Sequence, residues 1–182
     1  MATDLATMNL RRMACRALLA LATGFAPFAA IAQSATAVPP QAGFDLRGAT
    51  LEGKPFKLAD LRGKVVMVFF WSTDCAVCRS KMPELRANAE GWRGKPFELV
   101  LVSLDRRRAD LIEYDRLLAA TQANAVHFRN LWSGDPGYSD SLPQRPRQLP
   151  LTLLIDVQGR LAARFEGRIP AEAWDSVADL MP

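Results

Sequence analysis

The sequence predicts an α/β protein with a mixed central sheet and helices on both faces of that sheet. Apolar runs rich in β-branched and aromatic residues alternate with segments of helical spacing, which is typical of such folds. Two runs, Val65–Trp71 and Phe97–Leu104, flank a helical segment, so they are expected to pair in parallel. Two later runs, Leu151–Asp156 and Leu161–Gly167, flank a Gln-Gly turn, which predicts an antiparallel hairpin.

The other elements are predicted from helical spacing, glycine and proline. They are short strands and turns over residues 44–58, one helical turn over residues 58–64, and helices over residues 75–89, 106–121 and 170–180. Pro83 lies inside the first long helix and predicts a kink there. Pro170 lies at the start of the last helix, where proline is tolerated.

Size and charge limit the possible functions. The 182 residues are 49% hydrophobic and 23% charged, which fits one globular domain with a substantial core. The net charge is +4, and residues 1–32 account for half of it, with three arginines and one aspartate. The remaining near-neutral balance argues against a general nucleic-acid binder.

The first 32 residues have the pattern of an export signal. Three arginines precede an apolar run at residues 18–31 that is short for a membrane span. Small residues offer a cleavage site after Ala32, and a second site follows Ala37. We therefore expect a periplasmic protein in which residues 33–43 are a flexible lead and residues 44–182 form the folded domain. An uncleaved membrane anchor is the alternative.

Cys75-Ala76-Val77-Cys78 lies between a predicted strand and a predicted helix. Cys15 precedes the apolar run and would be removed with the signal, which leaves only this pair. A zinc site would need two more ligands, and His127 is the only histidine, so no metal site is predicted. An isolated CxxC in this context predicts a redox pair, with a static structural disulfide as the alternative.

The two cysteines are expected to have different roles. A helix N-terminus favours negative charge, so Cys75 should ionise more easily than a free thiol. Cys75 is therefore the predicted nucleophile, and Cys78 is the predicted resolving thiol. Asp74 either opposes that ionisation by like charge or, with Ser72 and Thr73, is a candidate for the residue that caps the helix.

Two segments resemble those of a known family. Residues 70–85, Phe-Trp-Ser-Thr-Asp-Cys-Ala-Val-Cys-Arg-Ser-Lys-Met-Pro-Glu-Leu, resemble the active-site segment of exported TlpA/ResA-like thiol–disulfide oxidoreductases. Residues 149–160 are similar to that group's second segment, in which a cis-proline precedes a strand and an Asp-x-x-Gly hairpin follows. Both lie in family order within residues 44–182, which implies a thioredoxin-like fold.

The resemblance also implies an activity and its partners. It implies thiol–disulfide exchange with protein clients, as a reductase supplied by a membrane electron donor, with no cofactor; we expect a monomer. It implies a cis Leu149–Pro150 bond packed against Cys75, which leaves the Leu149 backbone free to pair with a client peptide. Trp71 is expected to form a wall of this client-binding site.

The chain departs from the group at two acidic positions. Classical thioredoxins carry a buried acid six residues before the first cysteine, where this chain has Phe69. TlpA/ResA-like proteins often carry a glutamate three residues after the second cysteine, where this chain has Lys81. Both acids that would exchange a proton with the second thiol are therefore missing.

Two other functions remain open from the sequence. A peroxiredoxin-like thiol peroxidase shares the fold, but its T-x-x-C pattern fails here because Thr73 is followed three residues later by Ala76. A Cu(I)-binding module would use the two cysteines with His127 as a third ligand, since soft thiolates suit Cu(I).

Overall fold

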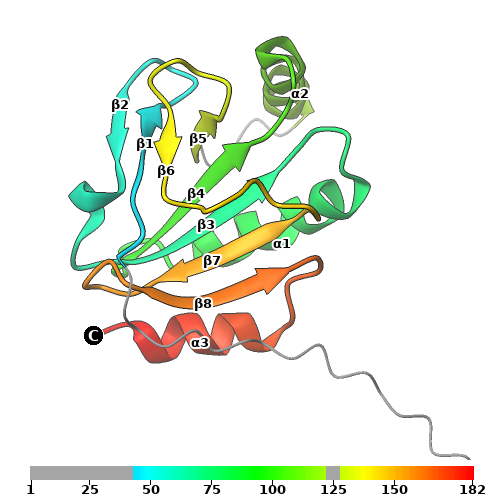
Figure 1. Cartoon of the computed structure of the whole chain (residues 1–182). Coiled ribbons are helices and arrows are strands. Elements are labelled where there is room, and N and C mark those ends of the chain that lie inside the picture. The colour runs from blue at the N-terminus through cyan, green and yellow to red at the C-terminus, as the bar shows by residue number, and fades with distance from the viewer. Residues whose placement is uncertain (1–42, 122–127) are drawn as a thin grey trace, which may run out of the picture. The chain divides into compact units, whose positions relative to one another are not determined.

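The computed structural model describes residues 43–121 and 128–182 (Figure 1). The expected export signal, most of the lead and His127 lie outside these residues. The strands are β1 (Leu46–Ala49), β2 (Pro55–Lys57), β3 (Val65–Trp71), β4 (Phe97–Ser103), β5 (Arg129–Trp132), β6 (Ser139–Asp140), β7 (Leu151–Ile155) and β8 (Leu161–Glu166). The helices are the 3₁₀ turn η1 (Leu58–Leu61) and the α-helices α1 (Ala76–Gly91), α2 (Arg108–Thr121) and α3 (Glu172–Leu180).

The main sheet of the described residues has the strand order β5-β4-β3-β7-β8. Strands β3 and β4 pair in parallel from Val65 opposite Phe97 to Trp71 opposite Ser103, as predicted. Strands β7 and β8 form the predicted antiparallel hairpin, and β7 also pairs antiparallel with β3. A second, smaller sheet has the order β2-β1-β6. Strands β5 and β6 were not predicted from the sequence.

Each central strand is buried on both faces, which explains its continuous apolar sequence. One face of the sheet packs against side chains of α1, α2 and α3, and the core cluster there includes Met67, Phe69, Trp71, Cys78, Met82, Leu85, Leu111, Ala173 and Val177. The opposite face packs against the small sheet and η1, with a cluster that includes Leu46, Phe56, Leu58, Leu61, Val66, Val68, Phe70, Leu151 and Leu153. The disulfide region therefore belongs to the face that the α-helices cover. Helices were expected on both faces; the three α-helices lie on this face, and the 3₁₀ turn η1 is the helical element on the opposite face.

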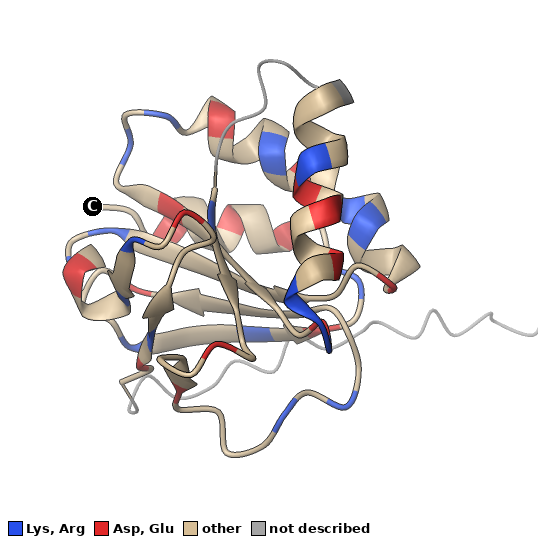
Figure 2. Ribbon diagram, turned by 90° about the horizontal axis from the view of Figure 1, so that it is seen from above, with Lys and Arg blue, Asp and Glu red and all other residues tan. Residues whose placement is uncertain are grey.

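Charged residues lie mostly outside the sheet. In Figure 2 the central strands are largely tan, whereas basic and acidic segments are interspersed along the helices and loops. Many of these charges are paired, for example Lys64 with Glu98 at 2.9 Å and Arg116 with Glu113 at 2.7 Å. Within residues 43–121 and 128–182, no helix combines the length and the apolar content needed to cross a bilayer.

The β7–β8 turn is fixed by a buried acid. Asp156 is 6% exposed, and its carboxylate accepts hydrogen bonds from the backbone N–H of Gln158 at 2.9 Å and of Arg160 at 2.8 Å. Gly159 supplies the positive φ of 77° that this turn requires. Because Ile155 pairs with Val66 near the start of β3, the turn lies at the end of the sheet opposite the CxxC segment.

Candidate active site

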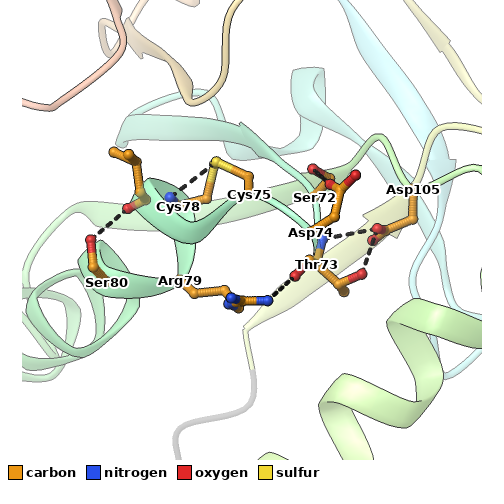
Figure 3. The surroundings of a disulfide bond; sticks show 9 residues. Ser72, Thr73, Asp74, Cys75, Cys78, Arg79, Ser80 and Asp105 are labelled. Atoms are coloured by element: carbon orange, nitrogen blue, oxygen red, sulfur yellow. Dashed lines mark hydrogen bonds between the residues drawn. A yellow bond between two sulfur atoms is a disulfide. The ribbon is translucent and has the colours of Figure 1, made fainter.

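The predicted cysteine pair is closed as a disulfide at the junction of β3 and α1 (Figure 3). The Cα atoms of Cys75 and Cys78 lie 5.2 Å apart, within the usual range for such a bond. The prediction that these two residues pair is therefore confirmed. The position after a buried strand fixes the backbone on one side of the pair, and the first turn of α1 fixes it on the other side.

The two sulfur-bearing residues differ in exposure. Cys78 is 0% exposed and belongs to the core cluster beside α1, whereas Cys75 is half-buried. Val77, between them, is 42% exposed and extends the accessible surface next to Cys75. An incoming sulfur atom can therefore reach the Cys75 side of the bond, while Cys78 is shielded by protein.

Cys75 itself caps helix α1. Its Sγ accepts a hydrogen bond from the backbone N–H of Cys78 at 3.1 Å, and its backbone is extended, with φ −78° and ψ 101°. The sequence had suggested Asp74, Ser72 or Thr73 as the cap, and this was wrong. Asp74 instead accepts a hydrogen bond from the Ser72 hydroxyl, and Thr73 is bound by another acid.

That acid is Asp105, a residue that the sequence analysis missed. It lies just after β4, is 8% exposed, and accepts hydrogen bonds from both the N–H and the hydroxyl of Thr73, at 2.8 and 2.7 Å (Figure 3). The sheet register explains this contact. Trp71 pairs with Ser103 in parallel strands, and Thr73 and Asp105 each lie two residues further along their chain segments. Aligning the two predicted parallel strands in that register would have found it.

Two basic residues in the first turns of α1 are held in separate contacts. Arg79 donates from Nη1 to the Thr73 carbonyl oxygen at 2.6 Å, across the turn that precedes Cys75. Lys81 forms an ion pair with Glu84 at 2.7 Å, and Glu84 also accepts a hydrogen bond from Trp174 Nε1 at 2.9 Å. Burial pushes the pKa of Glu84 upward, but the donors Lys81 and Trp174 hold this pKa below its ordinary value. Glu84 is thus an ionised partner of α3.

The Leu149–Pro150 peptide bond is cis, which confirms that prediction. Leu151 pairs with Phe70, so Pro150 lies level with Trp71 at the CxxC end of the sheet. Leu149 is half-buried and packs against the same core cluster as Cys75. Contact of Pro150 with Cys75, and pairing of the Leu149 backbone with a client, stay predictions.

Trp71 does not have the expected position. Its side chain is 0% exposed, and its ring packs edge-on against Tyr114 of α2 with centroids 5.0 Å apart. A buried ring offers no surface to a client, which corrects the expectation that Trp71 forms a wall of the binding site. The ring is large and apolar and ends a strand that is buried on both faces, so it fills the core behind the disulfide.

The described residues contain no cluster of three or more cysteine, histidine, aspartate or glutamate side chains arranged to hold a metal ion. His127, the third ligand of the copper alternative, lies outside them.

The comparisons with known proteins agree on the fold. The family model described as "AhpC/TSA family" matches residues 39–176. The structure of a thiol:disulfide interchange protein of the thioredoxin family from Chlorobium tepidum TLS is similar, with a TM-score of 0.61 and 21% identity over 79% of this chain and 97% of that one. A structure described as a putative thiol:disulfide interchange protein DsbE from Chlorobium tepidum has a TM-score of 0.57 and 26% identity over 79% and 94%. The expected thioredoxin-like fold is confirmed.

Curated relatives carry the name that the sequence resemblance had suggested. "Thiol-disulfide oxidoreductase ResA" of a Bacillus cereus strain is 26% identical over 121 residues, which are 64% of this chain and 63% of that protein. The protein of the same name from Bacillus subtilis (strain 168) is 25% identical over 115 residues, which are 63% and 60%. The chain therefore spans somewhat less than two thirds of the length of these relatives.

Proposed function

This chain belongs to the AhpC/TSA family, and on that premise we propose that it is a thiol–disulfide oxidoreductase that exchanges disulfides with protein clients. The observation that carries the proposal is the Cys75–Cys78 disulfide, with one accessible and one buried cysteine at the start of α1. The names of the ResA relatives and of the interchange proteins support the same activity.

The reaction starts from the reduced pair. The Cys75 thiolate attacks one sulfur of a client disulfide, the client S–S bond breaks, and the other client sulfur leaves as a thiolate that takes up a proton. Cys78 then attacks Sγ of Cys75, and the proton that it gives up balances the one that the departing client sulfur takes up. The mixed disulfide breaks, the second client thiol is released, and two electrons have passed from the cysteine pair to the client.

The geometry suits these two roles. Cys75 is the accessible sulfur, and as the helix cap it accepts the Cys78 N–H, a contact that strengthens when the sulfur carries negative charge. Cys78 is shielded from clients, and its disulfide with Cys75 in the oxidised protein shows that the two sulfur atoms can come within bonding distance, so its attack on the mixed disulfide needs no long movement. We propose that half-buried Leu149, at the same end of the sheet, contributes the surface on which a client peptide lies, and that the buried Pro150 holds the backbone of Leu149 in place.

We further propose that the protein acts as a reductase outside the cytoplasm, as a monomer supplied by a membrane electron donor. The basic, apolar and small-residue pattern of residues 1–32 supports export. Mass spectrometry of the protein recovered from the cell envelope tests this. A mature N-terminus after Ala32 or Ala37 in the soluble fraction is expected, whereas an intact N-terminus in the membrane fraction would show an anchor.

The catalytic roles are tested by trapping. Cys78→Ser should accumulate a mixed disulfide between Cys75 and a disulfide-containing model peptide, because the resolving thiol is lost. Cys75→Ser should accumulate none when Cys15 is also replaced by serine, since Cys78 is buried. Non-reducing electrophoresis and mass spectrometry read the products. Equal trapping by both variants would contradict the assignment, and rapid consumption of hydrogen peroxide by the reduced protein would favour the peroxidase alternative.

A further inference from the structure

We propose that Asp105 is a positioning residue for Cys75: its carboxylate clamps the turn before the helix and so keeps the Cys75 sulfur aligned with the N-terminus of α1. The inference rests on the proposed role of Cys75 as the attacking thiol. It assigns a task to an acid that neither the motif nor the spacing of the cysteines indicates.

Both carboxylate oxygens of Asp105 are engaged on the protein side. Oδ1 accepts from the N–H and the hydroxyl of Thr73, and Oδ2 accepts from the hydroxyl of Ser103 at 2.6 Å. The carbonyl oxygen of Asp105 accepts from Trp132 Nε1 at 2.8 Å, and its N–H donates to Ser103 at 3.1 Å. A buried carboxylate needs such donors, and removing the acceptor would leave the Thr73 N–H and hydroxyl without this partner.

Thr73 transmits this anchoring to Cys75. The residues are two apart, and the turn between them is closed by a hydrogen bond from Cys75 N–H to the Ser72 carbonyl at 3.2 Å. Arg79 holds the Thr73 carbonyl from the other side, so the turn is fixed both to β4 and to α1 (Figure 3). If the β4 anchor is lost, the turn can shift, and the bond from Cys78 N–H to Cys75 Sγ loses its alignment.

The consequence concerns the reduced protein. A thiolate at Cys75 is favoured by the N–H groups of the first helical turn only while its sulfur remains in the cap position. A misaligned sulfur forms thiolate less readily and reacts more slowly with any electrophile. The negative charge of Asp105 acts in the opposite direction, because removing it would favour the thiolate. The two effects therefore differ in sign and can be separated.

The experiment measures the rate at which iodoacetamide alkylates reduced Cys75 as a function of pH, in a Cys15→Ser, Cys78→Ser background, so that Cys75 is the one remaining thiol. Asp105→Ala should lower the rate near neutral pH about fivefold and move the midpoint of the pH profile upward, because the alignment with the helix N-terminus is lost. Asp105→Asn keeps an acceptor oxygen for Thr73 and should remain within about twofold of the parent. Thr73→Val keeps the N–H and removes the hydroxyl, so its alkylation rate should lie between the rates of Asp105→Ala and Asp105→Asn.

Asp156→Ala is the matched control for Asp105→Ala. Asp156 is also a buried acid that accepts backbone N–H groups of a turn, but at the opposite end of the sheet. The control variant should lower the stability of the folded protein and leave the pH profile of Cys75 alkylation unchanged. A comparable slowing in this control would assign the effect to general loosening and overturn the proposal.

Alkylation of Asp105→Ala at the parent rate would likewise overturn the proposal, because the loss of the carboxylate would then have no effect on Cys75. A faster rate would also overturn it, because that result would show that the removal of the negative charge dominates. If Asp105→Ala does not fold, a parent-like rate in Thr73→Val would overturn it instead. No client takes part, so failure of the wild type to reduce clients would contradict the proposed function and leave this inference standing.

Discussion

Reducing the Cys75–Cys78 disulfide should make the folded domain less stable, and the size of the loss can be worked from the structure. The bond links residues three positions apart, so it closes a very short loop. The chain-entropy relation for such a loop gives about 2 kcal/mol of stabilisation at 25 °C, because the cross-link restricts the unfolded chain.

One effect acts in the opposite direction. In the reduced protein, a Cys75 thiolate at the N-terminus of α1 stabilises the folded state by about 0.3–1 kcal/mol. The oxidised protein should therefore be more stable by about 1–2 kcal/mol above about pH 8.5, where a thiol is ionised even in the unfolded chain. This thiolate contribution is present only where the thiol ionises. At about pH 5 it is lost, the reduced protein becomes weaker, and the difference should widen toward about 2 kcal/mol.

Urea denaturation of the oxidised and the reduced protein, at matched pH, measures this difference. For a slope of about 2 kcal/mol per molar urea, the midpoint should fall by about 0.5–1 M on reduction. The Cys75→Ser, Cys78→Ser double variant is the control, because its midpoint should not respond to reductant. A reduced protein as stable as the oxidised one, or more stable, would refute the reasoning and would instead indicate a pair that favours oxidising its clients.

Two further predictions concern the framework of the site. Leu85→Ala removes a side chain of α1 that is 0% exposed and should lower the free energy of unfolding by about 2–5 kcal/mol in urea; a loss well below about 1 kcal/mol would contradict the packing. Burial pushes the pKa of Asp156 upward, but hydrogen bonds from Arg160 and Gln158 hold this pKa below its ordinary value of 3.8. The ionised carboxylate therefore stabilises the folded protein above pH 3.8, and this stabilisation is lost as the pH falls through the lower pKa of the folded state. Asp156→Asn should therefore narrow the difference in stability between about pH 7 and about pH 2, and an unchanged difference would contradict the argument.

The centre of the sheet could be predicted because its strands are buried on both faces and so carry unbroken apolar sequence. The edge elements could not. Strand β5 has four residues, begins with exposed Arg129 and pairs with β4, while β6 has two residues in a smaller sheet. Such short segments have neither a continuous apolar run nor a clear alternation, and only the tertiary pairing fixes them as strands.

The active site divides in the same way. Cys75 and Cys78 could be predicted because their geometry is local to one helical turn, and the cis bond before Pro150 followed from the family resemblance. The helix cap was assigned wrongly because Asp105 lies 32 residues from Thr73 and takes over its hydroxyl. The burial of Trp71 depends on α2 packing over it, which a strand pattern does not reveal.

The reduction potential of the Cys75–Cys78 pair tests the central claim most directly. The protein would be equilibrated in glutathione buffers of known ratio, and the oxidised fraction would be read by alkylation and mass spectrometry. A reductase is expected to titrate reversibly as a two-electron couple near about −270 mV, the value of thioredoxin. A potential near about −120 mV, that of a strong oxidant, or a disulfide that does not exchange with glutathione at all, would contradict the account.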